Sequence, residues 1–177
     1  MDVFVFDIDD TIIMHTKEEN DYYDSNNNTI LSEILSEFKD VKFYAYTNGT
    51  FGHGKAVADN LNLPLERVFG RDTIPFMKPE QKSFLFVDTE IRSELKEKGI
   101  TVKDIFFFDD LKDNLFVASR FTWKTILIDP SIGKKENYID YVFPNIYEAL
   151  LYLKKKNWLI FEKLFQRLWL HPHQALI

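Results

Sequence analysis

Short apolar runs that stop abruptly at polar or acidic residues are the clearest pattern along the chain. The three strongest strand candidates are Val3–Phe6, Val41–Tyr46 and Ile105–Phe108, of which the first and third are unbroken and the second is interrupted only by Lys42. Continuous apolar runs of this length are typical of strands that are buried on both faces of a parallel sheet. Three shorter segments are also predicted to be strands: 68–69, 125–128 and 141–142.

Between these runs, apolar residues recur at helical spacing. The segments with this period are 29–38, 53–61, 90–98, 113–120 and 146–170, the last with a break near Asn157. Gly99 is predicted to end the third of them as a C′ glycine. The polar, Asn-rich stretch 15–28 is predicted to be a loop. Strands that alternate with helices predict an α/β fold, with a parallel sheet and helices on both of its faces.

Length and composition narrow the class of protein. The 177 residues fit one compact domain, and 17 phenylalanines imply a bulky core. The absence of cysteine excludes disulfides, thiolate nucleophiles and Cys-type zinc sites. The net charge of −6 argues against a protein whose main task is to bind nucleic acid. Because the sequence has neither a membrane-spanning apolar run nor the basic start of a signal peptide, we expect a cytoplasmic protein.

The residues that directly follow the predicted strands carry the candidate chemistry. They are Asp7 and Asp9 after the first run, Thr47 after the second, and Asp109 and Asp110 after the third. In open α/β sheets the active site lies at the carboxyl ends of the strands, so these side chains should meet at one rim. Carboxylates that converge repel one another unless a cation lies among them. Oxygen ligands without cysteine favour Mg²⁺, and the chemistry implied is phosphoryl transfer.

The order of these signals resembles the four motifs of the haloacid dehalogenase (HAD) superfamily. The matching segments are Asp7-Ile8-Asp9-Asp10-Thr11 (DxDxT), Thr47, Lys78 before Pro79, and Asp109-Asp110 with Asn114. The resemblance covers the chain from about Met1 to Leu153 and looks most like the pyrimidine 5′-nucleotidase-like branch. It implies a Rossmann-like core and an enzyme of the phosphatase type.

The resemblance also implies roles for the acidic residues. Asp7 would attack phosphorus and form an aspartyl-phosphate, while Asp9 would protonate the leaving oxygen and later deprotonate water. Mg²⁺ would be held by the Asp7 side chain, the Asp9 backbone carbonyl and Asp110. Asp109 would lie close by or reach the ion through water. Phosphatases of the superfamily have the second acid, Asp9, and its dehalogenases lack it, so ester hydrolysis is the expected reaction.

The other motifs would bind the substrate. Thr47 and the amides around Asn48 and Gly49 would hydrogen-bond the phosphoryl oxygens, and Lys78 would neutralise their charge and steady Asp7. His53 is a minor candidate for contact with a substrate phosphate. A small departure from the family pattern lies at residue 122, where a threonine stands in place of the usual glycine. We expect a local adjustment of the turn there.

The intervals between the motifs leave little room for the cap domain of the nucleotidase-like relatives. We therefore expect a capless or minimally capped protein that hydrolyses a nucleotide or another small phosphorylated metabolite. An open site would also admit larger substrates, so a nucleic-acid end phosphatase or a phosphoprotein phosphatase is an alternative. A catalytically silent binding module is a second alternative.

The C-terminal part is predicted to be separate from the catalytic core. Residues 1–155 would form the core, and residues 156–177 an amphipathic helix and tail docked on it. A contact of this helix with a partner, with a second copy of the chain, or with a membrane surface is the alternative.

Overall fold

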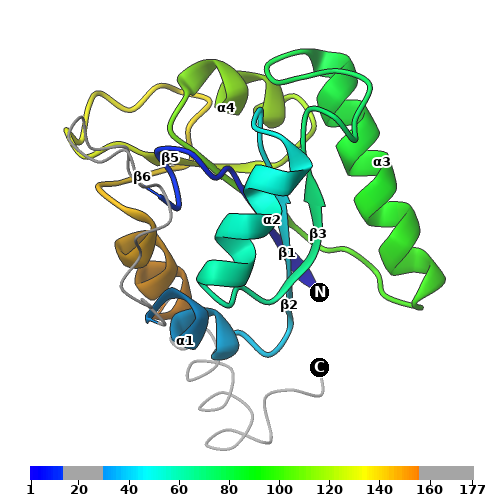
Figure 1. Cartoon of the computed structure of the whole chain (residues 1–177). Coiled ribbons are helices and arrows are strands. Elements are labelled where there is room, and N and C mark those ends of the chain that lie inside the picture. Colours follow the sequence, from blue (N-terminus) through cyan, green and yellow to red (C-terminus); the bar gives the residue numbers. More distant parts are fainter. Residues whose placement is uncertain (14–29, 156–177) are drawn as a thin grey trace, which may run out of the picture.

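The computed structural model describes residues 1–13 and 30–155, which are built around a six-stranded parallel sheet (Figure 1). The strands are β1 (Asp2–Phe6), β2 (Val41–Tyr46), β3 (Leu65–Phe69), β4 (Ile105–Asp109), β5 (Lys124–Ile128) and β6 (Tyr141–Phe143). The helical elements of the described residues are α1 (Ile30–Ser36), α2 (Phe51–Asn60), α3 (Gln81–Glu97), α4 (Lys112–Ser119) and a segment over 146–155. The predicted fold class, a parallel sheet with helices on both faces, is confirmed.

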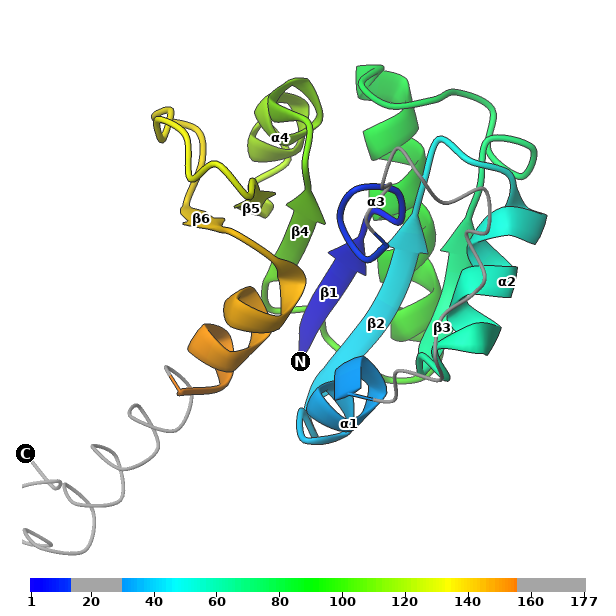
Figure 2. The ribbon, with the colours of Figure 1, turned by 60° about the vertical axis from the view of Figure 1, so that its left-hand side comes forward.

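The strand order places β1 at the centre of the sheet. The order is β3-β2-β1-β4-β5-β6, so the chain runs outward from β1 on one side and then returns to its other side at β4. Ligand sites of open α/β sheets lie at the carboxyl ends of the strands where the order reverses in this way. Figure 2 shows the loop after β1 at that end of the sheet, beside the ends of β2 and β4.

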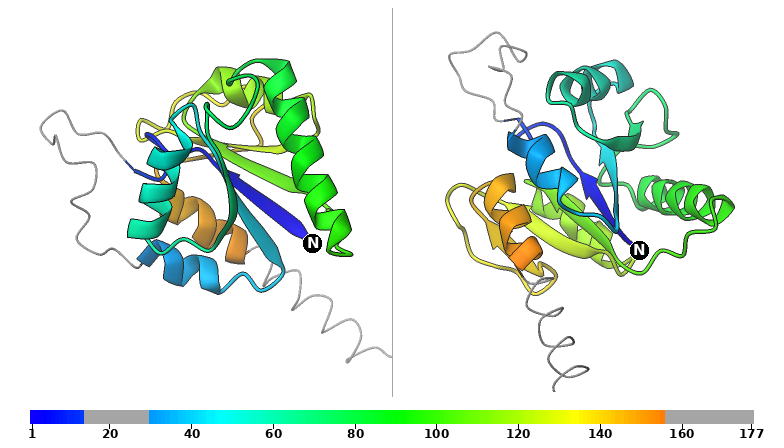
Figure 3. Two further views of the ribbon diagram at one scale, coloured as in Figure 1. Left: turned by 45° about the vertical axis from the view of Figure 1, so that its right-hand side comes forward. Right: turned by 90° about the horizontal axis from the view of Figure 1, so that it is seen from below.

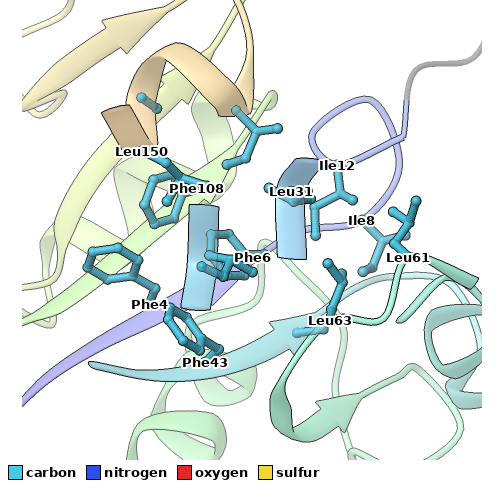
Figure 4. Close-up of a cluster of buried hydrophobic side chains, with 14 of the residues drawn as sticks. Phe4, Phe6, Ile8, Ile12, Leu31, Phe43, Leu61, Leu63, Phe108 and Leu150 are labelled. Carbon is cyan, nitrogen blue, oxygen red and sulfur yellow. The ribbon is translucent and has the colours of Figure 1, made fainter. Parts of the chain in front are cut away.

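One face of the sheet is packed with phenylalanine. The rings of Phe6 and Phe108 lie 4.8 Å apart, and Phe4 contacts Phe43 at 6.0 Å (Figure 4). Helices α1 and α2 and the segment 146–155 cover this cluster with leucine, valine and alanine side chains. Aromatic pairs of this geometry stabilise a core by about 0.5–1.5 kcal/mol each beyond their burial. The bulky core expected from the phenylalanine content is therefore located here.

The other face of the sheet is covered by α3 and α4. Side chains alternate along each strand, so Val3 and Val5 of β1 point to this face while Phe4 and Phe6 point to the first. In the left view of Figure 3 the sheet lies between α3 on one side and α1, α2 and the segment 146–155 on the other. The result is a three-layered arrangement in which β1 is buried on both faces.

The element boundaries correct the sequence prediction at α3 and α2, and β3 begins at Leu65 instead of Val68. Helix α3 begins at Gln81, whereas the apolar period predicted a helix only from Glu90. The residues before Glu90 include a contiguous apolar run, but Phe84 and Val87 are buried at helical spacing while Leu85 is 56% exposed. The second correction is that α2 begins at Phe51 instead of His53, because Thr50 caps its first turn.

Several predictions concern residues that the structure does not describe. The predicted loop 15–28 and the docked helix over 156–177 lie outside the described residues, and the domain boundary near 155 stays a prediction. In the second interval between motifs, the described residues form α2, β3 and a loop that leads to Lys78. Among the described helices, none combines the length and apolar character that a bilayer crossing requires.

Candidate active site

Strand register brings three of the predicted site residues to the centre of the rim. Phe6 of β1 pairs with Ala45 of β2 and with Phe108 of β4, and the backbone amide of Asp7 donates to the Phe108 carbonyl at 2.9 Å. Asp7, which directly follows β1, and Asp109, the last residue of β4, therefore lie side by side at the carboxyl ends of adjacent strands. Thr47, one residue past β2, is also buried at this level. The convergence expected from the sequence is present.

Lys78 joins two of these carboxylates through buried ion pairs. Its Nζ lies 2.8 Å from Asp7 Oδ1 and 2.7 Å from Asp109 Oδ2, with less than a tenth of each side chain exposed. Burial opposes the charge of the lysine, but the carboxylates of Asp109 and Asp7 outweigh it and raise the pKa of Lys78. Lys78 is thus held in its charged form beside the predicted nucleophile.

Aromatic rings complete the surroundings of the Lys78 ammonium group. Nζ lies 5.0 Å from the centre of the Tyr46 ring and 5.3 Å from that of Phe107. Contacts of this kind stabilise a desolvated cation. From the sequence, Tyr46 and Phe107 are predicted only to be strand residues. Their contribution to the site became visible only when the register of β2 and β4 was known.

Asp109 is held in place by the start of α4. Asn114 Nδ2 donates to Asp109 Oδ1 at 2.9 Å and to Oδ2 at 3.0 Å, and the backbone amide of Leu111 donates to Oδ1 at 2.8 Å. Together with Lys78, these donors occupy both oxygens of a fully buried carboxylate. Asp109 therefore orients Lys78 and fixes the turn between β4 and α4.

Asp110 is the more open member of the acidic cluster. Carboxylate oxygens of Asp7, Asp109 and Asp110 lie within 4.8 Å of one another. Burial, and next the charge of Asp109, raise the pKa of Asp110 to about 6. Burial also raises the pKa of Asp7 more than the nearby charge of Lys78 lowers it. Nearby positive charge therefore does not fully compensate the negative charge that either carboxyl group carries when it is ionised.

The charge balance of this cluster fits a divalent cation. Lys78 brings one positive charge to the carboxylates of Asp7, Asp109 and Asp110, which leaves two negative charges uncompensated. Oxygen ligands alone favour Mg²⁺ or Ca²⁺ over zinc. The donor set thus fits the predicted metal.

The residues after β2 form a tight loop beside the acidic cluster. Thr47 Oγ1 accepts a hydrogen bond from the Gly49 amide at 2.9 Å. The Asn48 side chain binds both sides of the Lys78 backbone: its Nδ2 donates to the Lys78 carbonyl and its Oδ1 accepts from the Lys78 amide, each at 2.9 Å. A substrate contact by Asn48 would therefore come from its backbone amide, while its side chain positions Lys78.

Asp9 lies on the α2 side of the rim and is paired with His53. Asp9 Oδ1 lies 2.8 Å from His53 Nε2, and the side chains are 33% and 20% exposed. The Ile8 side chain between the two aspartates points into the phenylalanine-rich core, as the alternation along the segment predicts. The contact of His53 is with a predicted site residue, which its sequence position alone did not indicate.

Solved structures with this architecture were found, although no protein-family model and no curated protein matches the chain. An L-2-haloacid dehalogenase superposes with a TM-score of 0.55 at 15% identity, covering 74% of this chain and 56% of its own. The L-2-haloacid dehalogenase from Xanthobacter autotrophicus gives 0.52 at 16% identity, covering 70% and 59%. A HAD-superfamily hydrolase of subfamily IA from Geobacter sulfurreducens gives 0.52 at 13% identity, covering 82% and 95%.

These superpositions, together with the strand order, show that the chain has the HAD-like fold. The resemblance inferred from the sequence motifs is confirmed at the level of the fold. The chain spans a little over half the length of the dehalogenases that it matches. The nucleotidase-like branch and the absence of a cap stay predictions.

Proposed function

We propose that this chain is a Mg²⁺-dependent phosphomonoester hydrolase that works through an aspartyl-phosphate on Asp7. The observation that carries the proposal is the buried cluster in which Lys78 binds Asp7 and Asp109 while Asp110 lies within reach of both. Phosphoryl transfer to an aspartate requires a nucleophilic carboxylate, a fixed cation beside it and a site for a divalent metal ion. The uncompensated negative charge of the cluster supports such a metal site.

The two chemical steps follow from the residues at the rim. In the first, an Asp7 oxygen forms a bond to phosphorus as the ester P–O bond breaks, and the Asp9 carboxyl group gives its proton to the leaving oxygen. In the second, Asp9 accepts a proton from water, whose oxygen binds phosphorus as the bond from Asp7 breaks. Inorganic phosphate leaves and both aspartates return to their starting forms.

The surrounding groups stabilise the charge that moves in these steps. Lys78 holds Asp7 in place, and its positive charge would stabilise the transferring group. Thr47 and the backbone amides of Asn48 and Gly49 would bind phosphoryl oxygens. Mg²⁺, held by the carboxylates of Asp7 and Asp110 and by the Asp9 carbonyl, would neutralise charge on the phosphoryl group.

Proton transfer distinguishes this proposal from the reaction named for the dehalogenases of the same fold. A halide leaves without a proton, whereas the oxygen of an alkyl ester needs one. Asp9 supplies a carboxyl group that is one-third exposed at the rim. Its presence supports ester hydrolysis, and a small phosphorylated metabolite or nucleotide is the substrate class we propose.

The test is release of phosphate from 4-nitrophenyl phosphate with and without Mg²⁺. We expect Mg²⁺-dependent turnover by the wild type and a loss of at least about a thousandfold in Asp7→Asn, since a nucleophile is removed. Asp59→Asn, which alters an exposed aspartate of α2, is the matched control and should keep its activity. Equal activity of wild type and Asp7→Asn would refute the proposal, and turnover of a 2-haloacid instead would favour the dehalogenase reaction.

A further inference from the structure

The contact between Asp9 and His53 is not explained by the phosphoryl chemistry alone. The two residues come from different elements: Asp9 follows β1, and His53 belongs to the first turn of α2. Their side chains meet at 2.8 Å, and both are partly exposed at the rim. An aspartate in such a position can rotate among several side-chain conformations unless a neighbour fixes one of them.

The local backbone is arranged to bring the imidazole to this carboxyl group. The Thr50 hydroxyl caps α2 and accepts from the His53 amide at 3.2 Å, which fixes the direction of the first helical turn. Gly49 lies beside the pair. A Cβ atom there would be 2.9 Å from His53 Cδ2 and 3.5 Å from Asp9 Oδ2. The lack of a side chain at residue 49 therefore leaves the space through which His53 reaches Asp9.

We propose that His53 is a positioning residue for Asp9, an inference that rests on the proposed function. By hydrogen-bonding Oδ1, the imidazole fixes the carboxyl group in one rotamer, the one in which it gives and accepts the proton. General acid–base catalysis contributes about a hundredfold to ten-thousandfold, and a small displacement of a group can cost about a hundredfold. Loss of the imidazole should therefore slow the reaction by about ten- to a hundredfold where protonation of the leaving group is needed.

The leaving group provides the discriminating measurement. Glycerol 1-phosphate loses an alkoxide that must be protonated by Asp9 as its P–O bond breaks. 4-Nitrophenyl phosphate loses a phenolate that is stable without a proton. Because kcat/KM reports the first chemical step when that step is irreversible, mispositioned Asp9 lowers kcat/KM for the alkyl ester far more than for the aryl ester.

The experiment compares kcat/KM on both esters for the wild type, His53→Ala and His53→Gln. Lys55→Ala is the matched control, since Lys55 lies on the same helix in an exposed pair with Asp59. We expect His53→Ala to lose at least about tenfold more on the alkyl ester than on the aryl ester. His53→Gln, whose amide can still reach the Asp9 carboxyl group, should recover most of that selective loss, and Lys55→Ala should match the wild type.

The outcomes separate this inference from the proposed function. If the wild type hydrolyses both esters but His53→Ala and His53→Gln lose the same factor on each, His53 acts on the phosphate or on the fold, and the inference is overturned. If both variants match the wild type, it is also overturned. A wild type that hydrolyses neither ester in Mg²⁺ would overturn the proposed function, and this inference with it.

Discussion

Lys78 is the residue on which the charge balance of the acidic cluster depends. It is buried between Asp7 and Asp109, and its removal would leave two carboxylates without their partner. Breaking a buried ion pair in this way costs about 3–5 kcal/mol of folding free energy. We expect Lys78→Met to lose that amount at pH 7 and to lose less at acidic pH, where the Asp7 carboxyl group, whose pKa is raised by burial, is protonated.

Chemical denaturation at pH 7 and pH 5 measures this effect. Lys82→Met is the control, because Lys82 is exposed and is the second residue of α3, close along the chain to Lys78. An equal effect of the two substitutions would show that the Lys78 ion pairs contribute little.

Thr122 adopts a backbone conformation that glycine favours. Its φ is 61°, in the left-handed region, where a β-branched side chain is strained by about 1–2 kcal/mol. Thr122 is exposed, so little packing depends on its side chain. We expect Thr122→Gly to raise the free energy of unfolding by about 0.5–1 kcal/mol, after the greater flexibility of glycine in the unfolded chain is allowed for. Thr122→Ala should change it less, and a destabilised glycine variant would contradict the strain.

Among the secondary-structure elements, α2 depends on a close approach of the chain after β3. A Cβ atom on Gly70 would lie 2.2 Å from the backbone nitrogen of Phe51, whereas one on Gly52 would meet nothing closer than 4.0 Å. Gly70→Ala must therefore displace the start of α2, and with it Thr50 and His53. We expect a loss of about 1–3 kcal/mol in stability and a large loss of phosphatase activity.

Gly52→Ala is the matched control for this prediction. It lies inside the same helix with open space around it, so it should stabilise the protein by about 0.5–1 kcal/mol and leave the rim intact. Thermal unfolding and phosphate release measured on both variants test the prediction. Similar behaviour of the two would show that the approach at Gly70 is not tight.

The elements differ in how well the sequence predicts them. Strands β1 and β4 contain the unbroken apolar runs Val3–Phe6 and Ile105–Phe108 because both faces of the sheet are covered, so their position follows from hydrophobicity alone. Gly99 ends α3 with a φ of 72°, as its position after the helix predicts. The apolar pattern does not predict the first half of α3, because the run Phe84–Val87 fits a buried strand as well as a helix. The packing of these residues against the rest of the fold determines which of the two forms.

The residues of the candidate site also differ in how well the sequence predicts them. The convergence of Asp7, Thr47 and Asp109 could be predicted because strand ends in a parallel sheet meet at one rim, whereas Lys78 lies in the loop between β3 and α3 and was indicated only by the resemblance to the family motifs. The bond from Asn48 to the Lys78 backbone and the pair of Asp9 with His53 could not be predicted, since they depend on the paths of loops. A polar side chain in a loop has many possible partners, and the sequence does not rank them.

At the scale of the whole molecule, the acidic rim opposes folding when no cation is bound. The raised pKa of Asp110, about 6 in the folded protein against 3.8 ordinarily, means that the folded state holds a proton more tightly than the unfolded state. Stability should therefore fall as the pH rises from about 4 to about 6 and stay reduced above it. Mg²⁺ competes with that proton and should restore the loss.

We expect Mg²⁺ to raise Tm more at pH 8 than at pH 5. At a hundredfold excess over its Kd, a ligand stabilises the native state by about 2.7 kcal/mol, which corresponds to about 5–10 °C for a chain of this size. Differential scanning calorimetry with Mg²⁺ and with an equal ionic strength of NaCl measures the shift. Asp110→Asn should remove most of it, and an equal shift at both pH values would contradict a carboxylate site.

The central claim, that Asp7 becomes phosphorylated, is tested most directly by trapping the intermediate. The wild type, Asp7→Asn and Asp59→Asn would be mixed with 4-nitrophenyl phosphate and Mg²⁺, quenched in acid, digested and analysed by mass spectrometry. The account predicts a phosphoryl group on the peptide that contains Asp7 in the wild type and in Asp59→Asn, absent from Asp7→Asn and from samples without Mg²⁺. Mg²⁺-dependent turnover with the phosphoryl group on another residue would contradict it.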